Sequence, residues 1–186
     1  MANPRGSEEP VLTVFTIGHS THEPDAFLVL LRRHRLATLV DVRSAPYSRY
    51  APHFSQGALH SLLDGAGVRY IWAGEALGGR PADPACYRDG IVRKGNVDYR
   101  AMARQPSYQD GVQCLLEHAA GGPVVMMCSE EDPRRCHRHH LIEPSLRERG
   151  VTVLHIRRDG ELESIDPDES ALAPPSPQLA LQGIET

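Results

Sequence analysis

Short apolar segments alternate with amphipathic segments from residue 11 to residue 156. The apolar segments are rich in branched aliphatic residues, which is typical of strands buried on both faces of a parallel sheet. They comprise residues 11–17, 39–42, 68–72, 124–127 and 151–156. The amphipathic segments between them repeat their apolar residues at intervals of three or four, which predicts helices with one buried face.

The predicted helices comprise residues 24–34, a segment that follows Ser55 and ends at Gly65 or Gly67, residues 107–119 and residues 136–149. Strands that alternate with helices predict an α/β fold, in which about five mostly parallel strands form one sheet with helices on both faces. Residues 73–105 interrupt this alternation, because they are rich in Gly, Arg and Asp and too long for a plain connection. We expect a functional insertion there, with one short helix at residues 99–104.

We expect a single domain at residues 11–165. A compact domain usually takes roughly 100 to 200 residues. The 186 residues of this chain are therefore enough for one domain with its own core. Residues 1–10 and 166–186 combine Pro, Ser and acidic residues with little packing potential, so we expect both ends to be disordered tails.

The charge and composition of the chain exclude several classes of protein. A net charge of -4 gives no overall attraction to nucleic acid or to an anionic membrane. The longest apolar run is far short of the roughly 20 residues that span a bilayer, and residues 1–10 lack the features of a signal peptide. We therefore expect a cytoplasmic protein with no membrane association. In that compartment the four cysteines stay reduced, and we assign Cys86 and Cys114 to packing.

Polar side chains follow four of the predicted strands, at the point where each strand ends. In an open parallel sheet, ligands bind outside the carboxyl ends of the strands, so these side chains should meet at one edge. The candidate residues in these four segments are His19, Asp41, Arg43, Ser44, Arg80, Cys128 and Glu130.

Cys128 ends an apolar strand and precedes a loop that leads to a helix expected near Cys136. A helix N-terminus and nearby arginines favour the thiolate, which is the reactive form of cysteine. Glu130 and its acidic neighbours oppose the thiolate, unless one of them is paired with an arginine or serves as a general acid or base. A cysteine in this position is also often a small buried apolar residue.

A metal site is the second interpretation of this segment. Cys128, Cys136 and His140, with His137 or His139 as the fourth ligand, would give zinc a tetrahedral set of donors. The seven residues between the two cysteines are an unusual spacing for zinc. We therefore prefer to interpret His139 and His140 as two solvated residues on a helix.

One further residue and one residue pair at this edge have open roles. His19 follows a glycine and precedes a predicted helix start, so it is either a general acid or base or part of a capped turn. Asp41 and Arg43 alternate along a strand and share one face of it. They either orient a ligand or form an internal ion pair.

Five short motifs in this order resemble a bacterial and archaeal family called domain of unknown function 488: TIGHSTH, LVDVRSAPYSRYAPHF, LGGR, MCSEEDPRRCHR and VLHI. The resemblance runs from about residue 14 to residue 156. It implies a single α/β domain with a strand-end motif C-x-E-x5-C-H-R, which has prompted suggestions of an enzyme without a settled reaction. The motif residues here are Cys128, Glu130, Cys136, His137 and Arg138. Neither His139 nor His140 belongs to the motif.

The first hypothesis is a cysteine-dependent enzyme: a transferase, a hydrolase or a thiol-redox enzyme. Cys128 would be the nucleophile or redox thiol and Cys136 a resolving or supporting thiol. Proton transfer would fall to Glu130, His137 and His19. The substrate would be a small anionic molecule or a nucleic-acid end, held by Arg138, Asp41, Arg43, Ser44 and Arg80. The alternative is a non-catalytic module that binds a nucleotide or nucleic acid, whose cysteines pack or ligate a metal such as zinc.

Overall fold

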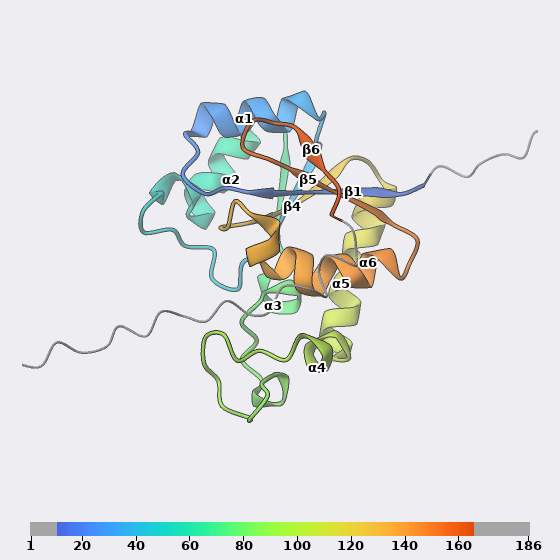
Figure 1. The fold of residues 1–186 in the computed structure, drawn as a ribbon. Coiled ribbons are helices and arrows are strands. Elements are labelled where there is room, and N and C mark those ends of the chain that lie inside the picture. Colours follow the sequence, from blue (N-terminus) through green and yellow to red (C-terminus); the bar gives the residue numbers. More distant parts are fainter. Residues whose placement is uncertain (1–10, 166–186) are drawn as a thin grey trace, which may run out of the picture.

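The computed structural model describes residues 11–165, so the predicted tails at residues 1–10 and 166–186 lie outside the described residues. The described residues form one six-stranded sheet with the strand order β3-β2-β4-β1-β5-β6 (Figure 1). The strands are β1 (Thr13–Gly18), β2 (Thr38–Asp41), β3 (Arg69–Trp72), β4 (Val124–Cys128), β5 (Thr152–Ile156) and β6 (Leu162–Glu163). All neighbouring pairs are parallel except β5 and β6, so the predicted α/β fold with a mostly parallel sheet is confirmed.

Helices cover both faces of the sheet, as the amphipathic pattern predicted. They are α1 (Pro24–Arg33), α2 (Gln56–Asp64), α3 (Gly74–Leu77), α4 (Tyr99–Ala103), α5 (Pro106–Ala120) and α6 (Glu143–Arg147). Helices α1 and α2 pack on one face, and α5 and α6 pack on the other (Figure 1). Cys114 of α5 is exposed, so its assignment to packing was wrong, whereas Cys86 is buried in the core.

The chain between β4 and β5 differs from the single helix predicted at residues 136–149. A 3-10 turn (Pro133–Arg135) leads into a π-helix (Arg138–Ile142), and only then does α6 begin. Pro144 has no N–H to donate to the preceding turn of an α-helix, which favours a wider turn before it. In this π turn the N–H of Glu143 donates to the carbonyl of Arg138. Single π turns are rare and often occur at functional sites.

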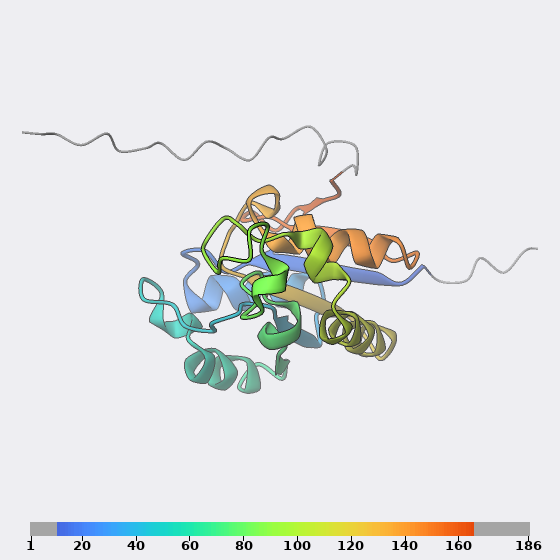
Figure 2. The same cartoon turned by 90° about the horizontal axis from the view of Figure 1, so that it is seen from below.

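The insertion between β3 and α5 packs on the same side of the sheet as α5 and α6. It contains α3, a 3-10 turn (Pro84–Cys86), an antiparallel bridge between Tyr87 and Val97, and α4. Cys86, Tyr87 and Met102 are buried in the core on this side. Figure 2, seen from below, shows the insertion in front of the sheet. It therefore covers this side of the carboxyl edge.

The pleat of the strands divides the carboxyl edge into two halves. Successive residues of a strand point to opposite faces. Cys128 therefore points with Met126 toward α5 and α6, and both residues belong to that core. Asp41 points with Leu39 toward the opposite face, where Leu39 packs against α1 and α2. The candidate residues predicted for one edge consequently form two clusters on opposite faces.

Gly18 is required where β1 ends, because the loop after β4 crosses directly over it. A Cβ atom at this position would overlap the backbone carbonyl of Glu130. We expect Gly18→Ala to displace that loop and to lower the free energy of unfolding by about 1–3 kcal/mol, as measured by urea denaturation.

Gly57 provides the matched control for this substitution. A Cβ atom added there, within α2, meets no atom within 4 Å. Since alanine favours a helix over glycine, Gly57→Ala should leave stability unchanged or raise it by up to about 1 kcal/mol. Equal losses of stability in the two variants would contradict the close approach at Gly18.

Candidate functional site

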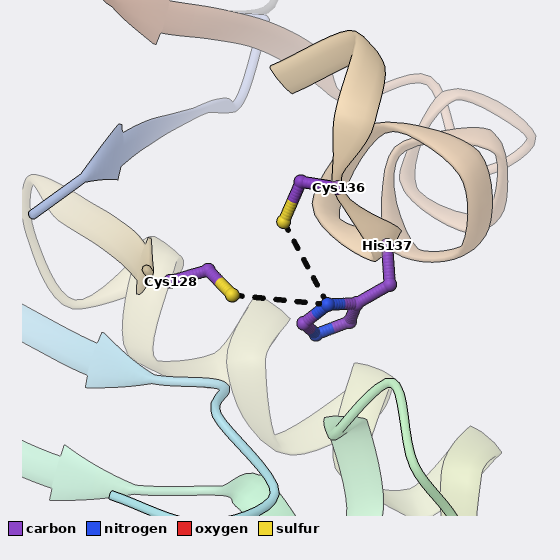
Figure 3. A group of neighbouring side chains, drawn as sticks. All are labelled: Cys128, Cys136 and His137. Carbon is purple, nitrogen blue, oxygen red and sulfur yellow. Dashed lines mark hydrogen bonds between the residues drawn. The ribbon is translucent and has the colours of Figure 1, made fainter. Parts of the chain in front are cut away.

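Two cysteines and a histidine meet at the end of β4, on the side of the sheet that α5 and α6 cover (Figure 3). Cys128 is the last residue of β4, and Cys136 and His137 directly precede the π-helix. The His137 Nδ1 atom lies 3.7 Å from the Cys136 Sγ and 3.9 Å from the Cys128 Sγ. The three residues are 4%, 2% and 8% exposed for Cys128, Cys136 and His137 respectively. Their contacts are therefore made almost entirely with protein atoms.

The hydrogen bonds of His137 determine which of its nitrogen atoms carries the proton. Its Nε2 atom lies 3.1 Å from the backbone carbonyl oxygen of Val42, which can only accept. The Nε2 atom therefore carries a hydrogen, and in the neutral ring Nδ1 has a free lone pair directed at both sulfur atoms. His137 can thus accept a thiol proton, after which its Nδ1–H faces the resulting thiolate.

The LGGR segment supports the His137 ring through close backbone contact. A Cβ atom on Gly79 would lie 2.7 Å from the His137 ring, so only glycine allows this approach. The next residue, Arg80, donates its backbone N–H to the Ser44 Oγ at 2.9 Å. Ser44 and the LGGR segment therefore form the support on which His137 rests.

Arg138 holds a buried positive charge against Cys136. Its side chain is 1% exposed. The Nε–H donates to the Cys136 Sγ at 3.3 Å, and an Nη2–H donates to the Glu130 carbonyl at 2.6 Å. An Nη1–H donates to the Thr16 Oγ1 at 3.1 Å. All three nitrogen atoms have a protein partner, so the guanidinium is fixed beside the sulfur.

These contacts give the two thiols opposite ionisation behaviour. Burial opposes the ionisation of Cys136, but hydrogen bonds from Cys128 and His137 and the charge of Arg138 outweigh it and hold the pKa of the Cys136 thiol well below its ordinary value. The hydrogen bond that Cys128 makes to Cys136, followed by burial, raises the pKa of the Cys128 thiol well above that value. Cys136 is therefore the thiol of the pair that loses its proton first as the pH rises.

Glu130 and Tyr99 complete the surroundings of the sulfur atoms. The Cys128 thiol lies 3.1 Å from the Glu130 Oε2, so its single proton has two acceptors, a carboxylate and the Cys136 thiolate. Tyr99, on α4 of the insertion, is partly buried. Its phenol pKa is raised by burial and then by the negative charges of Cys136 and Cys128. The insertion therefore contributes one wall of the site.

The second cluster lies on the opposite face of the sheet and is built on an ion pair. Arg43 donates from Nε to the Asp41 Oδ1 at 2.8 Å and from Nη2 to the Asp41 Oδ2 at 2.6 Å. The Tyr70 hydroxyl donates to the same carboxylate at 2.9 Å, and Arg43 also donates to the Phe54 carbonyl. Asp41 and Arg43 are 0% and 3% exposed. Of the two roles left open for this pair, the structure forms the internal ion pair.

His19 belongs to this second cluster, and both of its ring nitrogens have protein partners. Nδ1 donates to the Ser20 carbonyl at 3.0 Å, and Nε2 accepts from the Arg43 Nη1 at 3.1 Å. Its ring stacks on Phe54 with 4.5 Å between centroids. Burial and then the charge of Arg43 lower the pKa of His19 to about 4. His19 is therefore a neutral ring that helps to hold Arg43.

The structure thus separates the predicted candidates by their surroundings. One cluster unites the motif residues Cys128, Glu130, Cys136, His137 and Arg138. The other unites His19, Asp41 and Arg43. Ser44 and Arg80 belong to the support of the His137 ring, and the Arg80 side chain is exposed. Sequence reasoning missed Thr16, Tyr99 and the Val42 carbonyl, which are a residue within a strand, the first residue of a short helix in the insertion and a backbone atom.

A metal ion would find three donors in the first cluster. The Cys128 and Cys136 sulfurs and a His137 nitrogen lie within 4.8 Å of one another, and two thiolates with one imidazole suit zinc. His140 is not among them, because its Nε2 contacts the Arg134 carbonyl, and His139 contacts Glu143. The interpretation of His139 as a solvated helix residue was wrong, because its side chain is buried. Arg138 already supplies one positive charge against the cluster. The three donor atoms are of the types that bind zinc. A guanidinium beside the sulfur is nevertheless better suited to a thiolate without a metal, because Arg138 already supplies the positive charge.

Together, the fold and the site define an α/β protein with a buried dithiol and histidine at the carboxyl edge of a parallel sheet. Residues 23–144 match the family described as Domain of unknown function DUF488, and the chain belongs to this family. The resemblance of its motifs to that family is thereby confirmed. No curated protein and no solved structure matches the chain. Among residues 11–165, no helix has the length and apolar character needed to cross a membrane.

Protonation of His19 should make the protein less stable as the pH falls from about 6.5 toward 4. The ring has a pKa of about 4 in the folded protein against 6.5 ordinarily, so in this range the unfolded chain binds a proton that the folded protein does not. The resulting loss at pH 4 amounts to about 3 kcal/mol. Urea denaturation across this range should show a flatter pH dependence in His19→Gln than in the native protein.

His60→Gln is the control for this measurement, since His60 is exposed. It should retain the native pH dependence. Burial also lowers the pKa of His22, so a smaller slope should remain in His19→Gln. An unchanged slope in His19→Gln would show that His19 is not held neutral in the folded protein.

Proposed function

We propose that this protein is a cysteine-dependent enzyme in which Cys136 is the nucleophile and His137 its base. The observation behind this proposal is the position of the His137 ring, whose Nδ1 faces the Cys136 sulfur at 3.7 Å while Nε2 is fixed on the Val42 carbonyl. A nucleophile, a base and a third group that orients the base are the components of nucleophilic catalysis by cysteine.

This assignment exchanges the roles that the sequence analysis proposed for the two cysteines. The strand end placed Cys128 first, but Arg138 donates to Cys136 and thereby favours the thiolate there. Cys128 becomes the neighbouring thiol that stabilises this thiolate with its proton. Glu130 is exposed and contacts the Cys128 thiol, so it can exchange that proton with solvent.

The reaction that these groups support is a group transfer through a covalent intermediate. The Cys136 thiolate forms a bond to an electrophilic carbon or phosphorus atom, and the leaving group departs with its bonding electron pair. The leaving group takes the proton from the Nδ1 of the His137 imidazolium. Water, or another acceptor with an O–H or N–H group, then displaces the sulfur. His137 takes the proton of that acceptor and Cys136 returns as a thiolate.

Arg80 is the arginine best placed to bind an anionic part of the substrate. The guanidinium groups of Arg43 and Arg138 are occupied by internal partners. Arg80 is exposed and makes no ion pair within residues 11–165, and its charge acts on Tyr99, which borders the thiols. Since Cys136 is 2% exposed, a substrate reaches its sulfur only after some of the surrounding side chains move aside.

A metal-holding role is the second candidate, because three donor atoms lie within 4.8 Å of one another. In that case the protein would be a binding module, for a nucleotide or nucleic acid, in which the cluster stabilises the fold. Zinc binding would depend on Cys128 and Cys136 equally, whereas the thiolate proposal treats them differently.

The ultraviolet absorbance of the thiolate measures which cysteine is ionised without requiring access to the buried sulfur. In the metal-free native protein, a thiolate should be present well below the ordinary thiol pKa of about 8.5, because Arg138 and Cys128 stabilise it. Cys136→Ser should remove this absorbance. Cys128→Ala should retain it, with a midpoint at higher pH, since alanine has no polar hydrogen and the thiolate loses one hydrogen-bond donor.

Cys114→Ser is the control for this titration, because Cys114 is exposed, whereas Cys128 and Cys136 are buried. It should leave the low-pH absorbance unchanged. A thiolate that forms only near pH 8.5 in the native protein would overturn the proposal. Zinc that copurifies in a one-to-one ratio and is lost equally in Cys128→Ala and Cys136→Ser would favour the metal-holding role.

Activated esters with and without an anionic group test the role of Arg80 in substrate selection. Cys136→Ser should lower turnover by roughly a thousandfold or more. Arg80→Gln should raise KM about tenfold for the anionic ester and leave the neutral ester unaffected. Arg88→Gln, another exposed arginine of the insertion, should leave both unchanged. Equal effects of Arg80→Gln on both esters would exclude an anion-binding role.

A further inference from the structure

Buried polar side chains continue from Arg138 away from the thiols, and the proposed reaction does not use them. Thr16, His155, Glu143 and His139 are 0%, 1%, 2% and 4% exposed. Buried polar groups are costly unless they are hydrogen-bonded, so a connected set of them calls for a physical explanation.

The directions of the hydrogen bonds in this set follow from the chemistry of its members. Arg138 can only donate, so the Thr16 Oγ1 accepts from it at 3.1 Å. The Thr16 hydroxyl then donates its own hydrogen to the His155 Nδ1, 2.7 Å away. The His155 Nε2–H in turn donates to the Glu143 Oε2 at 3.0 Å. With these directions, the Thr16 hydroxyl and both nitrogen atoms of the His155 ring have a partner.

Glu143 accepts the last of the hydrogen bonds that run from Arg138 through Thr16 and His155. It also accepts from the His139 Nδ1 at 2.7 Å and from the Arg147 Nε and Nη2 at 2.8 and 2.6 Å. Burial alone would raise the pKa of Glu143, but the hydrogen bonds from His139 and His155 and the contact with Arg147 lower it to about 2. Glu143 is therefore an ionised carboxylate at every pH at which the thiols titrate.

The elements of the fold fix the distance that this row of hydrogen-bonded side chains spans. Thr16 of β1 and His155 of β5 are direct partners in the sheet register. Arg138 and Glu143 lie at the two ends of the π turn, whose extra residue reorients one relative to the other. The sheet and the π turn thus define the distance between the carboxylate and the guanidinium.

We propose that Thr16 and His155 are positioning residues, which hold the Arg138 guanidinium so that its Nε–H remains on the Cys136 sulfur. This inference rests on the proposed function, because it concerns the thiolate of that site. Without the Thr16 hydroxyl, one nitrogen of a buried guanidinium lacks a partner, and the side chain gains by turning toward another acceptor or toward water. The thiolate would then lose part of its stabilisation.

Several other charged or titratable groups face the Cys136 sulfur and have to stay constant in a test of this inference. His137 and Arg138 are on its own segment, Cys128 and Glu130 belong to β4 and the loop after it, and Tyr99 is on α4 of the insertion. Thr16 and His155 contact the sulfur only through Arg138. Substitutions at these two positions therefore change one contributor at a time.

Thr16→Val and Thr16→Ser form a matched pair for the test, since valine has the same shape without a hydroxyl and serine keeps the hydroxyl. The readout is the pH midpoint of the Cys136 thiolate absorbance in metal-free protein, with folding checked by circular dichroism. Thr16→Val should raise the midpoint by about one pH unit, a tenfold smaller thiolate fraction below it. Thr16→Ser should keep the native midpoint.

His139→Leu separates positioning from a loss of stability. His139 binds the same carboxylate as His155, but it is not on the path to Arg138. It should lower the thermal stability and leave the thiolate midpoint in place. If Thr16→Val does not fold, His155→Gln replaces it. A glutamine whose amide nitrogen takes the place of the His155 Nε2 still donates to Glu143, but it has a carbon atom and no acceptor at the place of Nδ1. Its midpoint should also rise.

The outcomes distinguish this inference from the proposed function. A native protein without a thiolate below the ordinary thiol pKa would overturn both. A low native midpoint that Thr16→Val and His155→Gln leave unchanged would overturn the positioning role alone. A rise in His139→Leu equal to that in Thr16→Val would likewise overturn it, because general loosening of the fold would then explain both results.

Discussion

A buried guanidinium in contact with a buried sulfur is the constraint on which the rest of the site depends. Arg138 is 1% exposed and Cys136 is 2% exposed, so water cannot solvate a charge on either group. A positive charge in such surroundings requires a nearby negative charge or a full set of acceptors. Arg138 has both: the Cys136 sulfur, the Glu130 carbonyl and the Thr16 hydroxyl. Retaining this charge inside the protein is what keeps a thiolate beside it.

The fold could be predicted from the sequence because the strands are apolar and the helices amphipathic, and both patterns have a fixed period. The positions of β1 to β5, and of α1, α2 and α5, follow from those patterns. The strand order does not, because it depends on which edges pair in space. The two-residue β6 is too short to have a period, and the π turn arises from Pro144, which a pattern of apolar residues does not register.

The sequence allowed us to predict which residues belong to the candidate site, but not how they are arranged in space. The carboxyl-end rule brought His19, Arg43 and Cys128 to one edge, and each of them lies there. The pleat then places Arg43 and Cys128 on opposite faces, which requires the exact register of each strand end. Thr16 and His155 remained unnoticed for a related reason. They lie within strands, where the role of a polar residue cannot be inferred until its partner on the neighbouring strand is known.

The distribution of protons between the two thiols follows from the same dependence on spatial position. In the sequence, Cys128 has a strand end before it and Cys136 a histidine and an arginine after it, and either could have been the thiolate. Hydrogen bonds from Cys128 and His137 and the charge of Arg138 all favour the thiolate on Cys136, while Glu130 lies beside Cys128 and favours its protonated form. The different neighbours of the two sulfur atoms thus divide the pair into a thiolate and a thiol. The carboxylate of Glu143, acting through His155 and Thr16, then determines the position of the Arg138 guanidinium.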